Sequence, residues 1–144
     1  MNLTEDIVAT MKLDTVIDTV KATVPSCIAA AAVDIASGML LAVRTDPDHR
    51  TPDLDQLAAA AEQVFLSAVL GSVGRAFSDG GDGATREAVL VTDGAVVVFQ
   101  RCRRKPGIAV VTVSKSSANL GMVLARARHA IANAESVILS SLAP

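Results

Sequence analysis

The chain has 144 residues, a length typical of one domain, and 51% of them are hydrophobic, so a core can form. Its formal net charge of −2 argues against general nucleic-acid binding, and its apolar stretches are too short for a membrane span. The first six residues lack a signal-peptide layout, and Cys27 and Cys102 lack the spacing of metal ligands. We therefore expect a single, reduced, cytoplasmic domain over residues 1–144.

The N-terminal third is predicted to form a helix and then a hairpin. Apolar residues recur at helical spacing over residues 4–24, and Pro25 ends the helix because the residue before a proline avoids the helical region. A break near Lys12 would make residues 1–12 a separate N-terminal arm. Residues 27–34 are apolar and alanine-rich, and their length and flanking turn residues favour a strand that pairs with residues 39–44.

A long helix is predicted over residues 52–77, and it carries two apolar stripes where an ordinary surface helix has one. The first stripe includes Leu57, Ala61, Val64, Phe65 and Ala68. The second stripe consists of Leu66, Val69, Leu70, Val73 and Phe77. The sheet of the same chain can cover one stripe. We expect the second to be covered by a copy of the chain or by another protein.

Three valine-rich runs over residues 88–92, 95–100 and 108–113 predict an antiparallel meander. Asp93-Gly94 predicts a type I′ turn, in which both central residues have positive φ. The runs do not alternate apolar and polar residues, so both faces of the meander are expected to be covered, by helices or by another subunit. A final helix follows Ser116-Ser117 and continues to about Ile138, and residues 140–144 are expected to fray.

Candidate catalytic residues are few. Cys27 with His49 or His129 could supply a nucleophile and a base, but no orienting motif surrounds them, and Cys27 lies in an apolar run typical of a buried cysteine. The glycine-rich segments 71–74 and 80–83 do not match a phosphate-binding loop. We expect no metal, no cofactor and no enzymatic activity.

A basic turn separates the second and third runs of the meander and contains Arg101, Arg103, Arg104 and Lys105. Two interpretations are open for these residues. They form a solvated turn, or they dock an acidic surface of a partner protein, where the positive charge would raise the association rate.

Two segments carry a resemblance to a known family. The first is Ala32 to Leu41, which precedes the alanine-rich long helix, and the second is Val110-Val111-Thr112-Val113-Ser114 followed by Asn119-Leu120-Gly121. Together with the order of the predicted elements, they resemble the Roadblock/LC7 family. The resemblance implies an α/β (α+β) profilin-like fold of order α-β-β-α-β-β-β-α, with a five-stranded antiparallel sheet between helices. It also implies homodimers and noncatalytic regulation of small Ras-like GTPases, or tethering of motor and signalling complexes.

The leading hypothesis is a homodimeric scaffold or regulator that binds another protein, such as a small Ras-like GTPase or a component of a signalling or motility complex. Helix contacts are expected at Leu57, Ala61, Val64, Phe65 and Ala68. Strand pairing with the copy is expected at Ala88, Val89 and Leu90. The alternative hypothesis is a small-molecule sensor with a ligand pocket on the sheet. A third, an enzyme, has no motif to support it.

Overall fold

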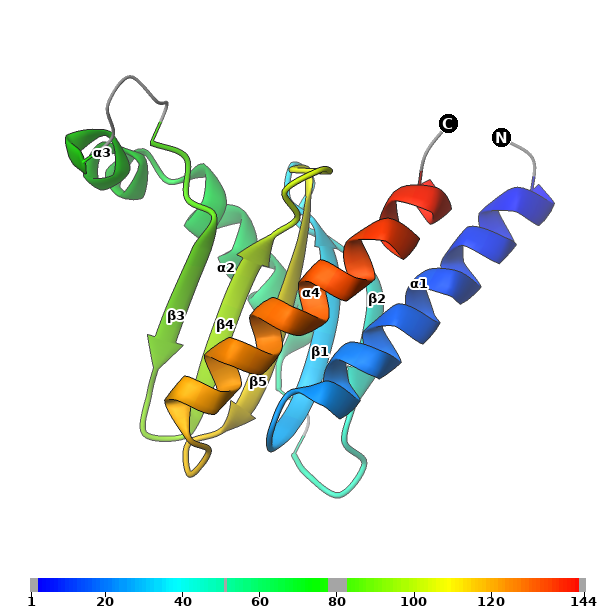
Figure 1. Cartoon of the computed structure of the whole chain (residues 1–144), viewed down its shortest axis with the longest axis horizontal. Coiled ribbons are helices and arrows are strands. Elements are labelled where there is room, and N and C mark those ends of the chain that lie inside the picture. Colours follow the sequence, from blue (N-terminus) through cyan, green and yellow to red (C-terminus); the bar gives the residue numbers. More distant parts are fainter. Residues whose placement is uncertain (1–2, 51, 78–82, 143–144) are drawn as a thin grey trace.

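The computed structural model describes residues 3–50, 52–77 and 83–142 (Figure 1). In chain order, the elements are α1 (Leu3–Thr23), β1 (Cys27–Asp34), β2 (Met39–Thr45), α2 (Leu54–Leu66), α3 (Ala68–Phe77), β3 (Glu87–Val91), β4 (Ala95–Arg101), β5 (Ile108–Lys115) and α4 (Leu120–Leu142). α1 continues through Lys12 without a break, and α4 includes residues 140–142 of the tail that was expected to fray. Residues 1–2 of the predicted arm and 143–144 of the tail lie outside the described residues.

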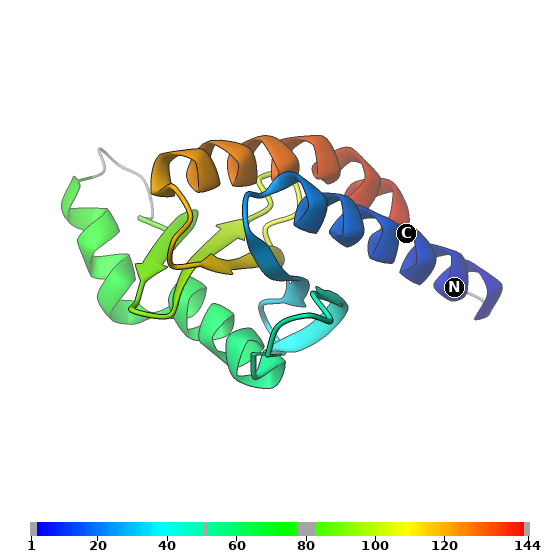
Figure 2. The same ribbon diagram turned by 90° about the horizontal axis from the view of Figure 1, so that it is seen from below.

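The five strands form one antiparallel sheet in the order β2-β1-β5-β4-β3. α1 and α4 cover one face of the sheet and α2 covers the other (Figures 1 and 2). This arrangement confirms the predicted fold, a five-stranded antiparallel sheet between helices. Both hairpins and the meander lie where the apolar runs and turn residues predict them.

The sheet separates two hydrophobic cores. Val98 and Val110 point to the core under α1 and α4, and Phe99 and Val111 point to the core under α2. Because neighbouring residues of one strand point to opposite faces, β4 and β5 need apolar residues at nearly every position. The prediction that both faces are covered is therefore confirmed for these two strands. On β3, Leu90 is 52% exposed within the chain, so its cover by another subunit stays a prediction.

The predicted long helix is two helices. α2 ends at Leu66, Ser67 takes an extended backbone conformation with ψ of 126°, and α3 begins at Ala68 with its axis bent by 41°. The hydroxyl of Ser67 accepts a hydrogen bond from the N–H of Leu70 at 3.3 Å. Serine is a good helix cap because its side chain replaces the missing backbone acceptor. Ser67 therefore ends one helix and caps the next.

The hairpin between β3 and β4 is predicted correctly, but the type I′ turn is wrong. Neither Asp93 nor Gly94 has a positive φ. Instead, the hydroxyl of Thr92 accepts hydrogen bonds from the N–H groups of Gly94 at 3.2 Å and of Ala95 at 3.0 Å. The threonine side chain thus closes the turn in the way a backbone carbonyl does elsewhere.

Candidate functional site

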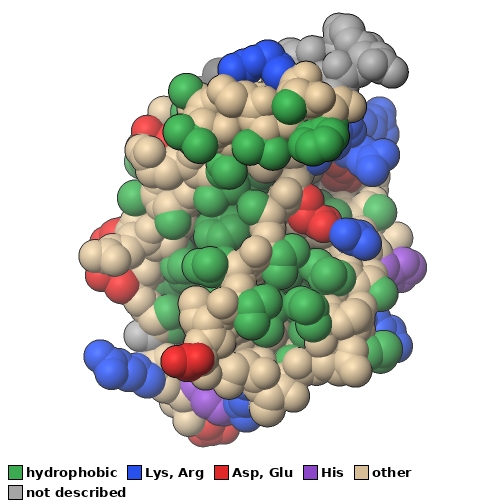
Figure 3. Space-filling model, turned by 90° about the vertical axis from the view of Figure 1, so that its left-hand side faces the viewer, with side chains coloured by type: hydrophobic (Ala, Val, Ile, Leu, Met, Phe, Trp, Pro, Cys, Tyr) green, Lys and Arg blue, Asp and Glu red, His purple; other side chains and the backbone are tan. Residues whose placement is uncertain are grey.

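Exposed apolar side chains gather on the β3 side of the molecule, on α3 and along the outer strand of the sheet (Figure 3). We call this area the β3–α3 surface. Its residues are Leu66, Val69, Leu70, Val73, Phe77, Val89, Leu90 and Val91. Phe77 is 88% exposed and Val69 is 73% exposed. Exposed apolar patches of this kind mark interaction sites on soluble proteins.

The position of β3 in the sheet adds a second property to this surface. β3 pairs with β4 on one side and is the last strand of the sheet on the other. An edge strand presents N–H and C=O groups that can pair with another strand, and natural proteins usually protect such an edge with charge or a covering element. Val89, Leu90 and Val91 provide no charge there, so the edge is open to another strand.

The structure divides the predicted helix contacts into two groups. Ala61 and Phe65 are buried at 0% and 6% exposure in the core under α2, so their side chains have little area left for a partner. Leu57 and Val64 are half-buried against that core, and Ala68 is exposed. On β3, Ala88 is half-buried while Val89 and Leu90 are exposed at 38% and 52%. The prediction that these residues contact a second copy therefore depends on the exposed ones, which are Ala68, Val89 and Leu90.

The basic turn does not form one patch. Arg101 extends along the face of the sheet that α2 covers. Its Nη2 donates to the carbonyl oxygen of Phe65 at 3.1 Å, and its guanidinium lies 5.1 Å from the centre of the Phe65 ring. Arg103 and Arg104 are exposed and Lys105 is half-buried. Only Arg101 and Arg103 of the four line the cleft described next. Docking of an acidic partner on this turn stays a prediction.

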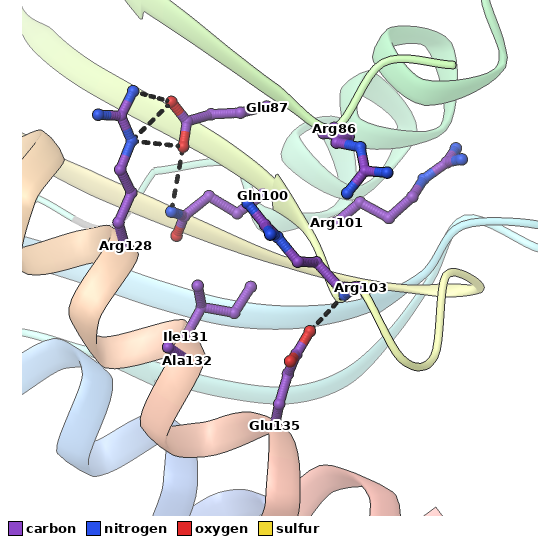
Figure 4. A pocket seen from close by; sticks show the side chains of 9 residues that line it. All are labelled: Arg86, Glu87, Gln100, Arg101, Arg103, Arg128, Ile131, Ala132 and Glu135. Carbon is purple, nitrogen blue, oxygen red and sulfur yellow. Dashed lines mark hydrogen bonds and ion pairs between the residues drawn. The ribbon is translucent and has the colours of Figure 1, made fainter. Parts of the chain in front are cut away.

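A cleft of about 520 Å³ lies between the start of β3, the end of β4 and α4 (Figure 4). We call it the arginine cleft. Gln100, Ile131 and Ala132 contribute to its lining. Its charged residues are Arg86, Arg101, Arg103, Arg128, Glu87 and Glu135. The sequence alone does not reveal this site, because these residues come from three separated segments and Arg128 belongs to none of the motifs described above.

Glu87 and Arg128 form a bidentate ion pair at one end of the arginine cleft. Arg128 Nη2 lies 2.6 Å from Glu87 Oε1, and Arg128 Nε lies 3.0 Å from Glu87 Oε2. The amide of Gln100 donates to Glu87 Oε2 at 3.4 Å. The hydrogen bond from Arg128, more than that from Gln100, holds the pKa of Glu87 below its ordinary value. The pair joins α4 to the outer strand of the sheet.

The lowered pKa of Glu87 predicts a pH-dependent contribution to stability. A carboxylate with a depressed folded-state pKa stabilises the fold above its ordinary pKa, here 4.5, and loses this contribution as the pH falls through the folded value. We expect the difference in unfolding free energy between wild type and Glu87→Gln to be constant near neutral pH and to shrink in acid. Urea unfolding over a pH series measures it. A difference that stays constant into acid would contradict the ion pair.

The thiols and histidines do not form a catalytic arrangement. Cys27 is buried and its thiol donates to the carbonyl oxygen of Ala29, and burial raises its pKa. Burial also raises the pKa of the free thiol of Cys102 to about 12. His49 pairs with Asp46 at 3.0 Å, and His129 contacts the amide of Asn133 at 3.0 Å. A thiol with a raised pKa is a poor nucleophile at neutral pH.

The described residues also bear on metal binding and on membrane insertion. Over residues 3–50, 52–77 and 83–142, no group of three or more His, Cys, Asp or Glu side chains could hold a metal ion. In that same part of the chain, no helix alone has both the length and the apolar character to cross a membrane, although α2 and α3 would have them together if their bend is disregarded.

No model of a protein family and no curated protein matches the sequence. Solved structures do match. A structure described as MglB with a tetrameric arrangement is 16% identical, with a TM-score of 0.76 over 93% of each chain. The gliding protein MglB from Thermus thermophilus is 16% identical, with a TM-score of 0.75 over 92% of each chain. A Roadblock/LC7 domain from Streptomyces avermitilis is 20% identical, with a TM-score of 0.66 over 88% of this chain and 97% of that one. The predicted resemblance is thus confirmed at the level of the fold.

Proposed function

We propose that this chain, whose fold is that of the Roadblock/LC7 domain, is a noncatalytic homodimeric module that regulates or scaffolds another protein. The observation that carries this proposal is the β3–α3 surface. It combines an open strand edge with exposed apolar residues on the adjoining helix. A second copy and a partner protein are the two occupants that the sequence predicts for the second apolar stripe.

The strand edge favours a second copy of the chain. Two β3 strands that pair across a twofold axis would join the two sheets and satisfy the outward-facing backbone groups. Val89, Leu90 and Val91 of both copies would then lie at the junction, where their exposed area leaves water. A stable interface buries roughly 800 Å² on each partner, which needs helix contacts in addition to one short strand. Leu57, Val64 and Ala68 are the candidates for these.

The α3 part of the surface favours a further partner. Val69, Val73 and Phe77 stand away from the sheet, on a helix that follows α2 and has no buried residue. The similar structures include gliding proteins, and the resemblance of the sequence implies regulators of small Ras-like GTPases. A small GTPase of a motility or signalling complex is therefore the partner that we propose. The buried Cys27, with its raised pKa, supports a role without nucleophilic catalysis.

Light scattering and affinity capture test the proposal separately. We expect the purified chain to have twice the mass of one chain over a broad concentration range. We expect the immobilised chain to retain a Ras-like GTPase from native lysate, and Val73→Glu on α3 to lose it while staying dimeric. A monomer at every concentration would contradict the dimer. A GTPase that is absent from the captured proteins, or that binds Val73→Glu equally well, would contradict the partner.

A further inference from the structure

We propose that the arginine cleft binds a phosphate-bearing small molecule through a diphosphate group. This site goes beyond the proposed function and does not depend on dimerisation or on a protein partner. It gives a physical basis to the alternative hypothesis from the sequence, a ligand pocket on the sheet. The proposal rests on the charge of the cleft, on the contacts its charged groups already make, and on its size.

The cleft holds more positive than negative charge. It is lined by four arginines and two glutamates. Both glutamates already have partners on the protein, because Glu87 binds Arg128 and Gln100, and the carboxylate of Glu135 accepts from the backbone N–H of Arg103. Within the described residues, three of the four guanidinium groups are therefore left without a carboxylate. The guanidinium of Arg101 lies over the Phe65 ring, so Arg86 and Arg103 supply the positive charge that is left in the cleft to favour an anion.

The contacts identify which guanidinium groups are available. Arg128 is held by Glu87, and Arg101 donates to the carbonyl oxygen of Phe65. For the side chains of Arg86 and Arg103, the described residues supply no ion pair and no hydrogen-bond acceptor. Figure 4 shows the side chain of Arg103 extended back over the sheet towards Gln100, and the side chain of Arg86, which immediately precedes β3, beside that of Arg101. These two arginines are the proposed ligand contacts.

The size and shape of the cleft select a small ligand with clustered negative charge. A volume of about 520 Å³ is within the range of small-molecule sites, roughly 300 to 1,000 Å³. A planar guanidinium binds phosphate oxygens in pairs, and two guanidinium groups match adjacent phosphates. Ile131 and Ala132 offer an apolar wall for the rest of the ligand. Inorganic diphosphate and a nucleoside diphosphate share this chemistry.

Titration calorimetry with inorganic diphosphate and with ADP tests the site. We expect both probes to bind the intact chain. The double variant Arg86→Gln with Arg103→Gln should weaken binding at least about tenfold, equivalent to roughly 1.4 kcal/mol. The matched control is Arg104→Gln with Arg126→Gln, which removes the same charge from exposed residues outside the cleft. It should weaken binding less than about twofold, because it changes only long-range attraction.

A second measurement does not depend on variants. In NMR titrations, diphosphate should shift amide signals of residues 86–87, 100–103 and 128–135, and leave those of α2 unchanged. Tighter binding of ADP than of diphosphate would identify a nucleotide as the ligand. Equal binding of the two would identify free diphosphate. Either result supports the site. Absence of binding, equal weakening by both double variants, or shifts confined to other regions would overturn the proposal. A dimeric chain that binds no diphosphate would leave the proposed function standing.

Discussion

Leu90→Lys is expected to convert the proposed dimer into a folded monomer. Leu90 lies on the edge strand β3 and is 52% exposed in the single chain, so lysine can replace it without entering the core. In the proposed dimer the same position lies at the junction of two β3 strands. Two ammonium groups brought together there would repel each other and lose water, which is how natural edge strands prevent pairing. Light scattering should show a fall from twice the chain mass to the chain mass.

Met39→Lys is the matched control for this experiment. Met39 is also exposed, at 63%, and it lies on β2, the strand at the opposite edge of the sheet. The chemical change is similar, and no interface is proposed there, so the mass should stay at two chains. Circular dichroism should show that both variants remain folded. A dimer that survives Leu90→Lys, or that is lost equally in Met39→Lys, would rule out pairing through β3.

The strands can be predicted from sequence because their signals are local. β-branched residues are frequent in β3, β4 and β5, and Asp93-Gly94 marks a hairpin whatever its turn type. In the first hairpin, Gly38 adopts a φ of 68°, a conformation that suits glycine after the residues of the Asp34–Ser37 turn. For β4 and β5, apolar runs without alternation correctly indicate central strands with two covered faces.

The break at Ser67 and the exposure of β3 depend on contacts that sequence periodicity does not carry. Ser67 does not interrupt the helical spacing of the apolar residues around it, and a serine can lie within a helix as well as cap the start of one. Likewise, Val89-Leu90-Val91 has the same uninterrupted apolar pattern as the buried strands β4 and β5. Only the strand order shows that β3 is at the edge. An apolar run can thus indicate burial against another chain as well as within its own.

The arginine cleft shows the same limit for a site. Glu87 and Arg128 are separated by 41 positions in the sequence and meet through the packing of α4 on the sheet. Arg86 and Glu87 alone suggest edge charges, and Arg103 alone suggests a solvated turn. A weak signal exists in the charges that flank the start of β3 and the end of β4, because antiparallel pairing of the two strands brings those ends together.

Phe65→Ala is expected to cost about 3–5 kcal/mol of stability, the usual effect of truncating a buried phenylalanine. Phe65 is 6% exposed and packs in the core under α2, where Arg101 also lies over its ring at 5.1 Å. A domain of this size is stable by only about 5–15 kcal/mol, so the variant should be near the limit of folding at physiological temperature. Urea unfolding measures the loss.

Phe77→Ala is the matched control, because it makes the same chemical change at a residue that is 88% exposed. Its unfolding free energy should change by less than about 0.5 kcal/mol, as is usual for surface substitutions. The two variants distinguish an apolar residue that is buried in the core from one that is exposed in the single chain. If Phe65→Ala were as stable as Phe77→Ala, then α2 would not be packed on the sheet. A large loss in Phe77→Ala would mean that α3 is buried against a second copy on which folding depends.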